Sequence, residues 1–123
     1  MKKVFASLLA LSLMLVGCGG GKGGEKEEAK DKTPVIALVT DQGTISDKSF
    51  NQSAWEAVEK YGKEKDLGYK YYKPATFDTA GYTAQIENAV DNGAKVIVCP
   101  GFKFSETIAN IQEKYKDVKF ILI

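Results

Sequence analysis

VIALVT-DQGTISDKSFN-QSAWEAVEKY, residues 35–61, is the stretch that decides the fold. Val35–Thr40 is a continuous run of apolar and β-branched residues, the pattern of a strand buried on both faces. Apolar residues then recur at helical spacing over Phe50–Tyr61, so a helix is expected there. Ser49, followed by Gln52, predicts a capping box at its start. Strand, long polar loop and helix together predict the first unit of an α/β fold.

The same alternation continues to the end of the sequence. Further strands are expected at Leu67–Lys73, Lys95–Pro100 and Val118–Ile123, the last two as buried strands. Further helices are expected where apolar residues recur over Tyr82–Val90 and Phe104–Tyr115. Strands that alternate with helices imply right-handed βαβ crossovers. The expected fold class is α/β, a parallel sheet with helices on both faces.

Composition excludes several kinds of function. The 123 residues carry a formal net charge of +1 and include no histidine. Nucleic-acid-binding domains usually carry a strong basic stripe, so no nucleic-acid partner is expected. Histidine, the commonest general base and metal ligand, is therefore missing. The sequence also has no Cys/His cluster, Walker-type loop or GxGxxG motif. No catalytic residue, metal site or cofactor is therefore predicted.

The N-terminal residues have the pattern of a targeting segment. Two lysines precede the apolar run Val4–Gly17, which is shorter than the about 20 residues a transmembrane helix needs and fits a secretory signal. The run ends in LVGC, which looks like a bacterial lipobox, in which the cysteine becomes linked to diacylglycerol. Residues 1–18 are therefore predicted to be a lipoprotein signal peptide with its lipobox, and Cys18 the lipidation site.

A flexible tether and one folded region are expected after the leader. Residues 19–33 are rich in glycine and mixed charge, with too little apolar surface to offset the entropy cost of ordering. The folded region is expected over 34–123. Within it, Cys99 lies in an expected strand and is predicted to be a buried core residue. Because the strand predicted at 118–123 is followed by no polar tail, we expect the sequence to be the N-terminal part of a longer protein.

Two loops contain the candidate ligand contacts. In parallel α/β sheets, ligands bind outside the carboxyl ends of the strands, where connections leave for opposite faces. The loop DQGTISDKSFN, residues 41–51, and the loop PGFKFS, residues 100–105, both follow expected strands. Each combines glycine, an aromatic ring and polar groups, which are the components of a small-molecule pocket.

The polar side chains in the first loop each have more than one possible role. Asp41 either accepts hydrogen bonds from a ligand, for example from sugar hydroxyls, or organises the loop as an Asx turn. Asp47 either faces a ligand or contributes capping and favourable charge at the next helix. Asn51 offers a donor and an acceptor that suit a heterocycle edge or a ribose.

The aromatic rings are equally open to two interpretations. Phe50 is either a core staple at the start of the helix or a ring that stacks on a planar base. Phe102 has the same two possible roles. Gly101 before it supplies a tight turn or a close backbone approach.

Together these residues resemble the basic membrane protein family of bacterial lipoproteins, the substrate-binding lipoproteins of nucleoside ABC transporters. The resemblance rests on the leader and lipobox, on D-x-G-x-x-x-D-x-S-F-N-Q-x-x-W-E from Asp41, and on G-F-x-F from Gly101. It covers the whole mature chain. It implies a type I periplasmic-binding-protein fold with ligand clamped between two lobes, of which this sequence would supply the first part of lobe one.

The resemblance also implies roles for individual residues. The family holds a purine between two phenylalanines, one from each lobe, and Phe50 matches the first. Other positions match polar cleft residues and the second cleft loop: Asp41, Ser49 and Asn51, and Gly101 with Phe102. The second phenylalanine and an aspartate after the fourth strand are not in this sequence. The 123 residues by themselves are therefore expected to bind nucleoside weakly or not at all.

The function that the resemblance implies is solute binding without enzymatic activity. A lipoprotein anchored on the extracytoplasmic face of a bacterial cell membrane would capture a purine nucleoside and deliver it to an ABC transporter permease. Two alternatives stay open. One is a flavodoxin-like signalling or enzymatic domain, with Asp41 as a metal ligand or the neighbour of a phospho-acceptor, against which the export signal argues. The other is a surface lipoprotein without a transport role.

Overall fold

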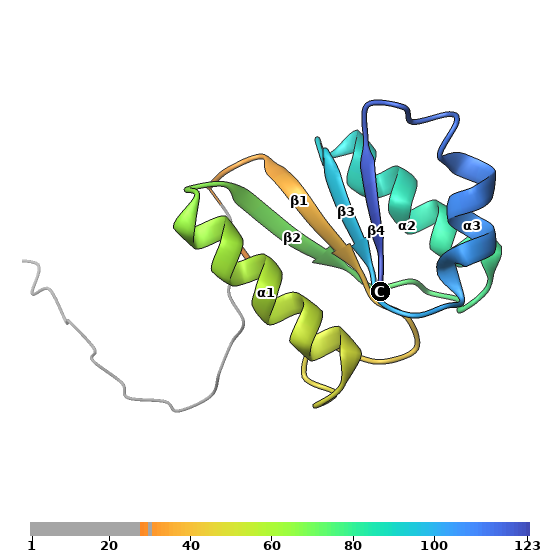
Figure 1. Ribbon diagram of the computed structural model, residues 1–123, viewed down its shortest axis with the longest axis horizontal. Helices are drawn as coiled ribbons and strands as arrows, with labels where there is room; N and C mark the ends of the chain where they lie inside the picture. Colours follow the sequence, from red (N-terminus) through yellow and green to blue (C-terminus); the bar gives the residue numbers. More distant parts are fainter. Residues whose placement is uncertain (1–27, 30) are drawn as a thin grey trace, which may run out of the picture.

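The computed structural model of the protein describes residues 28–29 and 31–123 (Figure 1). The predicted signal peptide, its lipobox cysteine Cys18 and most of the predicted tether 19–33 lie outside these residues. Strands and helices alternate along the described chain as predicted. Their bounds are β1 Pro34–Val39, α1 Phe50–Glu64, β2 Gly68–Tyr72, α2 Thr79–Asp91, β3 Val96–Cys99, α3 Phe104–Ile111 and β4 Lys119–Leu122.

The strands of the described region form one parallel sheet in the order β2-β1-β3-β4. Helix α1 covers one face, and α2 and α3 cover the other (Figure 1). The crossovers from β2 to β3 and from β3 to β4 run in one direction across the sheet, whereas the crossover from β1 to β2 runs in the opposite direction. Right-handed crossovers therefore place α1 alone on its face. The predicted α/β class, with helices on both faces, is confirmed.

The core lies on both faces of the central strands. Ala37 and Val39 face α2 and α3, whereas Ile36 and Leu38 face α1, where Trp55 is fully buried. Successive side chains of a strand point to opposite faces, so a strand covered on both sides needs an uninterrupted apolar run. Full burial of one such aliphatic side chain stabilises the fold by roughly 1.5–3 kcal/mol.

Cys99 is a core residue, as predicted. Its side chain is fully buried in β3, and burial raises the pKa of its thiol to about 12. No group of three or more His, Cys, Asp or Glu side chains in the described residues is placed to hold a metal ion. None of the described helices is long and apolar enough to cross a membrane.

Helix α3 is shorter than predicted. It ends at Ile111, and the residues that follow form turns in which the amide of Val118 donates to the carbonyl of Tyr115 over 2.9 Å. Tyr115, expected in the helix, still packs against the core, and its hydroxyl donates to Glu87 over 3.2 Å. Tyr115 therefore packs on the core as expected, but it does so from a turn instead of from a helix.

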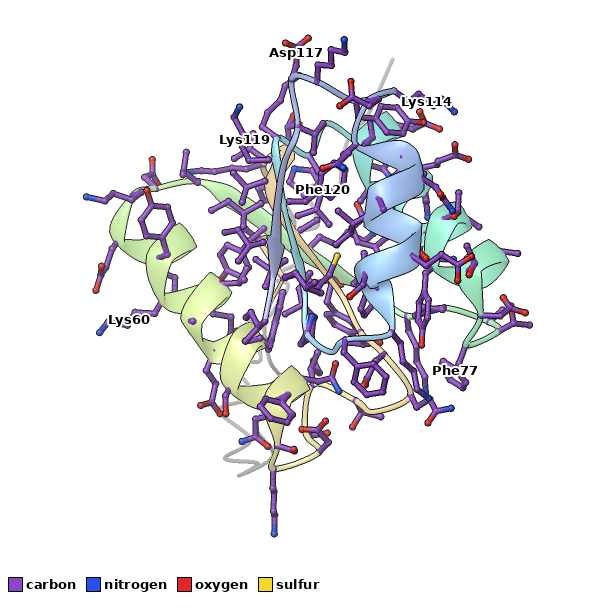
Figure 2. The ribbon with its side chains drawn as sticks, turned by 45° about the vertical axis from the view of Figure 1, so that its right-hand side comes forward. Lys60, Phe77, Lys114, Asp117, Lys119 and Phe120 are labelled. Carbon is purple, nitrogen blue, oxygen red and sulfur yellow. The ribbon has the colours of Figure 1, made fainter. Side chains whose placement is uncertain are left out.

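Strand β4 is correctly located but is not buried, so that part of the prediction is wrong. It pairs with β3 alone among the described strands, and Ile121 and Leu122 are 46% and 45% exposed. Phe120 lies between β4 and α3 and packs against the core on that side (Figure 2). Apolar composition predicts burial only if both faces are covered, and the α1 face of β4, on which Ile121 lies, has no described element over it.

The chain enters the sheet at its amino edge, opposite the edge where the candidate loops lie. The amide of Ala29 donates to the carbonyl of Tyr69 over 3.3 Å. Thr33 passes so close to Gly68 that a Cβ there would lie 2.1 Å from the Thr33 carbonyl oxygen. The described part of the predicted tether therefore contacts the folded region at the end remote from the candidate site.

Candidate ligand-binding site at the carboxyl edge of the sheet

The two candidate loops lie next to each other. They follow β1 and β3, which are neighbours in the sheet, and both leave its carboxyl edge (Figure 1). Gly101 has a φ of 116°, and a Cβ on it would lie 3.2 Å from Oδ2 of Asp41. A side chain at 101 would thus be strained and would press on the Asp41 carboxylate. The structure brings Asp41 and Gly101 together, as the positions of the loops predicted.

The loop after β3 is held in a tight turn that leaves Phe102 in solvent. The amide of Gly101 donates to the carbonyl of Ile123 over 2.9 Å, and the amide of Phe104 donates to the carbonyl of Gly101 over 3.2 Å. The Ser105 hydroxyl donates to the carbonyl of Phe102 over 2.7 Å. The Phe102 side chain itself is 81% exposed. The turn is therefore fixed by its backbone, and the ring does not serve as a core residue.

Asn51 is the centre of the loop after β1. It is 2% exposed, and its amide nitrogen donates to Oδ1 of Asp41 and to Oδ2 of Asp47, each over 2.7 Å. Its amide oxygen accepts from the backbone amide of Asp41 over 3.2 Å. Both donors and the acceptor are thus used within the protein. In this structure Asn51 holds the loop together, which is a different role from the ligand contact that the resemblance implied.

The carboxylate of Asp41 is divided between two roles. Oδ1 accepts from the amide of Gly43 over 2.8 Å as well as from Asn51, which is the Asx-type organisation of the loop that the sequence allowed. Oδ2 points toward Gly101 and the loop after β3. Asp41 therefore organises its own loop with one oxygen and presents the other between the two loops.

The helix cap is supplied by Asp47, and the predicted Ser49–Gln52 capping box is wrong. Oδ1 of Asp47 accepts from the amides of Ser49 over 2.8 Å and Gln52 over 3.2 Å, while the Ser49 side chain makes no capping bond. Gln52 Oε1 accepts from the amide of Lys48 over 2.9 Å instead. Lys48 has a φ of 57°, so the backbone turns there and places the Asp47 carboxylate over the first turn of α1.

The hydrogen bonds to Asp47 also keep it ionised. Desolvation acts to raise its pKa, but the bonds from the Asn51 side chain and from the backbone of Ser49 and Gln52 together hold the pKa below its ordinary value. The charge then lies at the N-terminus of α1, where the helix dipole favours an anion. The capping role that the sequence allowed for Asp47 is the one it has here.

Phe50 begins α1 but points away from the core. Its side chain is 70% exposed, so it is not a core staple, and Ser49 before it is exposed as well. Asn51, the next residue, is bonded to Asp41, which fixes the start of the helix relative to the sheet. The ring is thus an exposed apolar group on a rigid support, available to stack on a planar partner.

Sequence reasoning missed two features of this edge. Gly43 packs closely on two of these side chains, since a Cβ on it would lie 2.3 Å from the Asn51 amide nitrogen and 2.4 Å from Oδ2 of Asp47. The loop after β2 also ends here, with Phe77 partly exposed and Asp78 capping α2 (Figure 2). The spacing Asp41-x-Gly43 was a usable turn signal. For the loop after β2, Asp78 before the apolar repeat of α2 was the corresponding cap signal.

A parallel α/β sheet with exposed rings and an oriented carboxylate at its carboxyl edge is the architecture of a small-molecule-binding protein. A family model described as ABC transporter substrate-binding protein, PnrA-like, matches residues 34–123. The chain therefore belongs to this family, and the recognition of its sequence motifs is confirmed. The family consists of substrate-binding proteins of ABC transporters and not of enzymes.

Several curated relatives are similar over almost the whole chain. A protein of Listeria innocua named CD4+ T-cell-stimulating antigen is 32% identical over 99% of the chain and 37% of its own length. The ABC transporter nucleoside-binding protein BmpA of Lactococcus lactis is 30% identical over 98% of the chain and 35% of its own length. A lipoprotein of Pyrococcus abyssi is 31% identical over the full chain and 31% of its own length. The chain thus spans about a third of the length of these relatives.

Solved structures share the fold. A transcriptional activator of the comK gene from Bacillus halodurans superposes with a TM-score of 0.61 at 20% identity, over 72% of this chain and 29% of that one. At this identity the likeness shows the α/β fold alone.

Proposed function

We propose that the protein captures a purine nucleoside and delivers it to the permease of an ABC transporter. The observation that carries this proposal is the pair of exposed rings, Phe50 and Phe102, each next in sequence to a residue, Asn51 or Gly101, that contacts or closely approaches the Asp41 carboxylate. A phenyl face stacks on a planar base, and a carboxylate accepts hydrogen bonds from base or ribose. Membership of the substrate-binding family and the name of the Lactococcus lactis relative support it.

Each residue then has a part in binding, and no covalent bond is made or broken. Phe50 covers one face of the base, and Oδ2 of Asp41 accepts from the ligand. Asn51 acts through Asp41, because both of its amide donors bond to carboxylates and its oxygen accepts from the Asp41 backbone. Phe102 and the exposed Ser49 hydroxyl supply further contacts at the rim. Contacts from a second lobe would complete the site.

The protein would act on the extracytoplasmic face of a bacterial membrane, anchored through Cys18. The lipobox-like end of the leader supports this, as does the occurrence of a lipoprotein among the relatives. A diacylglycerol carries two acyl chains, and two chains are what stable anchoring requires. The glycine-rich and charged residues between Cys18 and the domain would let the domain move relative to the membrane.

Calorimetric titration of the protein, as its host produces it, with inosine and guanosine tests the proposal. Loss of the ring in Phe50→Ala is expected to weaken binding by about 1–3 kcal/mol, roughly 5- to 150-fold in Kd, because one stacking face is lost. Tyr61→Ala is the matched control, since it removes an exposed ring near the other end of α1. Unchanged affinity in Phe50→Ala would rule out stacking on Phe50, and failure of the unsubstituted protein to bind either nucleoside would overturn the proposal.

A further inference from the structure

Tyr82 has a buried hydroxyl group beneath the candidate ligand site. Its side chain is 1% exposed, and its hydroxyl oxygen has no hydrogen-bond partner among the described residues. Buried polar groups are nearly always hydrogen-bonded, because a buried group without a partner loses its bonds to water and gains none in return. An unpaired buried hydroxyl in a folded protein therefore indicates that it acquires a partner in another state of the protein.

The position of Tyr82 directs its hydroxyl toward the two candidate loops. Tyr82 lies in the first turn of α2, whose N-terminus is at the carboxyl edge of the sheet (Figure 1). Long side chains of a helix lean toward its N-terminus, so the hydroxyl points to that edge. The Tyr82 ring packs on Phe104, with the ring centroids 4.3 Å apart. The amide of Phe104 in turn donates to the carbonyl of Gly101, the residue that closely approaches Oδ2 of Asp41.

Two carboxylates are near enough to act on this hydroxyl. Burial raises the pKa of Tyr82 above its ordinary value, and the charges of Asp41 and Asp78 raise it further, so the group stays a neutral donor. Asp78 is exposed, and its Oδ1 already accepts two hydrogen bonds at the start of α2. Asp41 organises its own loop through Oδ1, and its Oδ2 lies toward Gly101. Oδ2 of Asp41 is therefore the better acceptor for the Tyr82 hydroxyl.

We propose that Tyr82 is a positioning residue of the ligand site, and that its hydroxyl donates to Oδ2 of Asp41 when a nucleoside is bound. A carboxylate oxygen can accept more than one hydrogen bond, so the ligand reaches it from the solvent side and Tyr82 from the protein side. A hydrogen bond to a charged acceptor is about twice as strong as one between neutral groups, and it holds the carboxylate in the orientation that the ligand needs. The inference rests on the proposed function, because it concerns the oxygen to which the nucleoside donates.

Tyr82→Phe, made in the protein as its host produces it, tests this by two measurements. Because the hydroxyl has no partner in the structure, its removal is expected to leave the melting temperature of the ligand-free protein unchanged or higher. In calorimetric titrations with inosine and guanosine, the Kd is expected to rise roughly 10-fold or more, because one hydrogen bond to a charged acceptor is lost from the complex. A purely structural role would lower the melting temperature and the affinity together.

Tyr115→Phe is the matched control, for which the opposite pattern is expected. The Tyr115 hydroxyl donates to Glu87 over 3.2 Å, and Tyr115 lies between α3 and β4, at the amino edge of the sheet. Its removal should lower the melting temperature and leave the affinity unchanged. Unchanged affinity in Tyr82→Phe, or a melting temperature that falls with the affinity, would overturn the inference and leave the proposed function standing. Failure of the unsubstituted protein to bind either nucleoside would overturn both.

Discussion

Asn51 shows how one buried amide can organise a loop that carries two acids. Its side-chain nitrogen lies between Asp41 and Asp47 and donates to both. The two carboxylates therefore share one donor group. Because Phe50 and Asn51 are consecutive, the same bonds also set where the exposed ring stands. In this structure Asn51 thus supports two candidate contacts, Asp41 and Phe50, and its own contact with a ligand stays a prediction.

Replacement of Asn51 by alanine is expected to lower the free energy of unfolding by about 1–3 kcal/mol, since it leaves partly buried acceptors without their donor. Urea unfolding followed by circular dichroism measures the change. Asn110→Ala, at an exposed position of α3, is the matched control and should change stability little. Equal effects of the two substitutions would show that the hydrogen bonds of Asn51 do not hold the loop.

Gly43→Ala tests the close approach at the same point. The added methyl would lie well inside contact distance of the Asn51 amide and the Asp47 carboxylate, so these side chains must shift and their hydrogen bonds weaken. Hydrogen exchange at the amides of Ser49 and Gln52, which Asp47 accepts from, is expected to become faster. Gln42→Ala, at the exposed neighbouring position, should leave these rates unchanged. Unaltered exchange in Gly43→Ala would mean that the loop accommodates a methyl group.

Among the elements, α2 has the simplest cap. Asp78 accepts from the amide of Gly81 over 2.8 Å and from the Thr76 hydroxyl over 2.9 Å, and these bonds lower its pKa from 3.8. A carboxyl group whose pKa is lowered by folding stabilises the fold fully above its unfolded pKa. That stabilisation is lost as the pH falls from about 3.8 through the lower value of the folded state.

Asp78→Asn should therefore separate capping from titration. Asparagine caps helices about as well as aspartate but does not titrate, so the melting temperature is expected to stay near that of the unsubstituted protein above about pH 5. Below about pH 4 the melting temperature of Asp78→Asn should decline less steeply than that of the unsubstituted protein. Thermal melts from pH 2 to pH 6 measure this, with the exposed Asp117→Asn as control (Figure 2). A slope in Asp78→Asn as steep as that of the unsubstituted protein would contradict the assignment.

The whole molecule is an asymmetric sheet, covered on both faces at β1 and open at β4. The amides of Lys119 and Ile123 donate to the carbonyls of Lys95 and Cys99, next to and at the end of β3. Because alternate amides of a strand point to opposite sides, those of Phe120 and Leu122 point to the free edge. Another strand can therefore pair with this edge. Its apolar side chains favour such pairing more than charged side chains would.

Hydrogen exchange of the 123-residue chain, followed by NMR, should show this asymmetry. The amides of Lys119 and Ile123 are expected to exchange slowly, and those of Phe120 and Leu122 faster by at least an order of magnitude. The corresponding amides of β1, which has a neighbour on each side, serve as the internal control. Similar protection along the whole of β4 would mean that its outer edge is paired in solution.

Much of the architecture follows from local pattern. The run at Val35–Thr40 and the helical repeats predicted all the described strands and helices in order, because periodicities of 2 and 3.6 residues reflect which faces are covered. The proximity of the two candidate loops also followed, since neighbouring parallel strands end at one edge. The cap of α1, the end of α3 and the exposure of β4 did not follow, because each depends on a backbone turn or on a neighbour.

The sequence by itself determined the α/β class, the two loops of the candidate site and the burial of Cys99, because these rest on periodicity and on the order of the elements. Only the tertiary structure decided that Asp47 and not Ser49 caps α1, and that Asn51 turns inward while Phe50 turns outward. Consecutive residues on a helix point about 100° apart, so a small rotation of α1 against the sheet chooses which is buried. That rotation is set by contacts such as the one between Asn51 and Asp41, which lie ten residues apart in the chain.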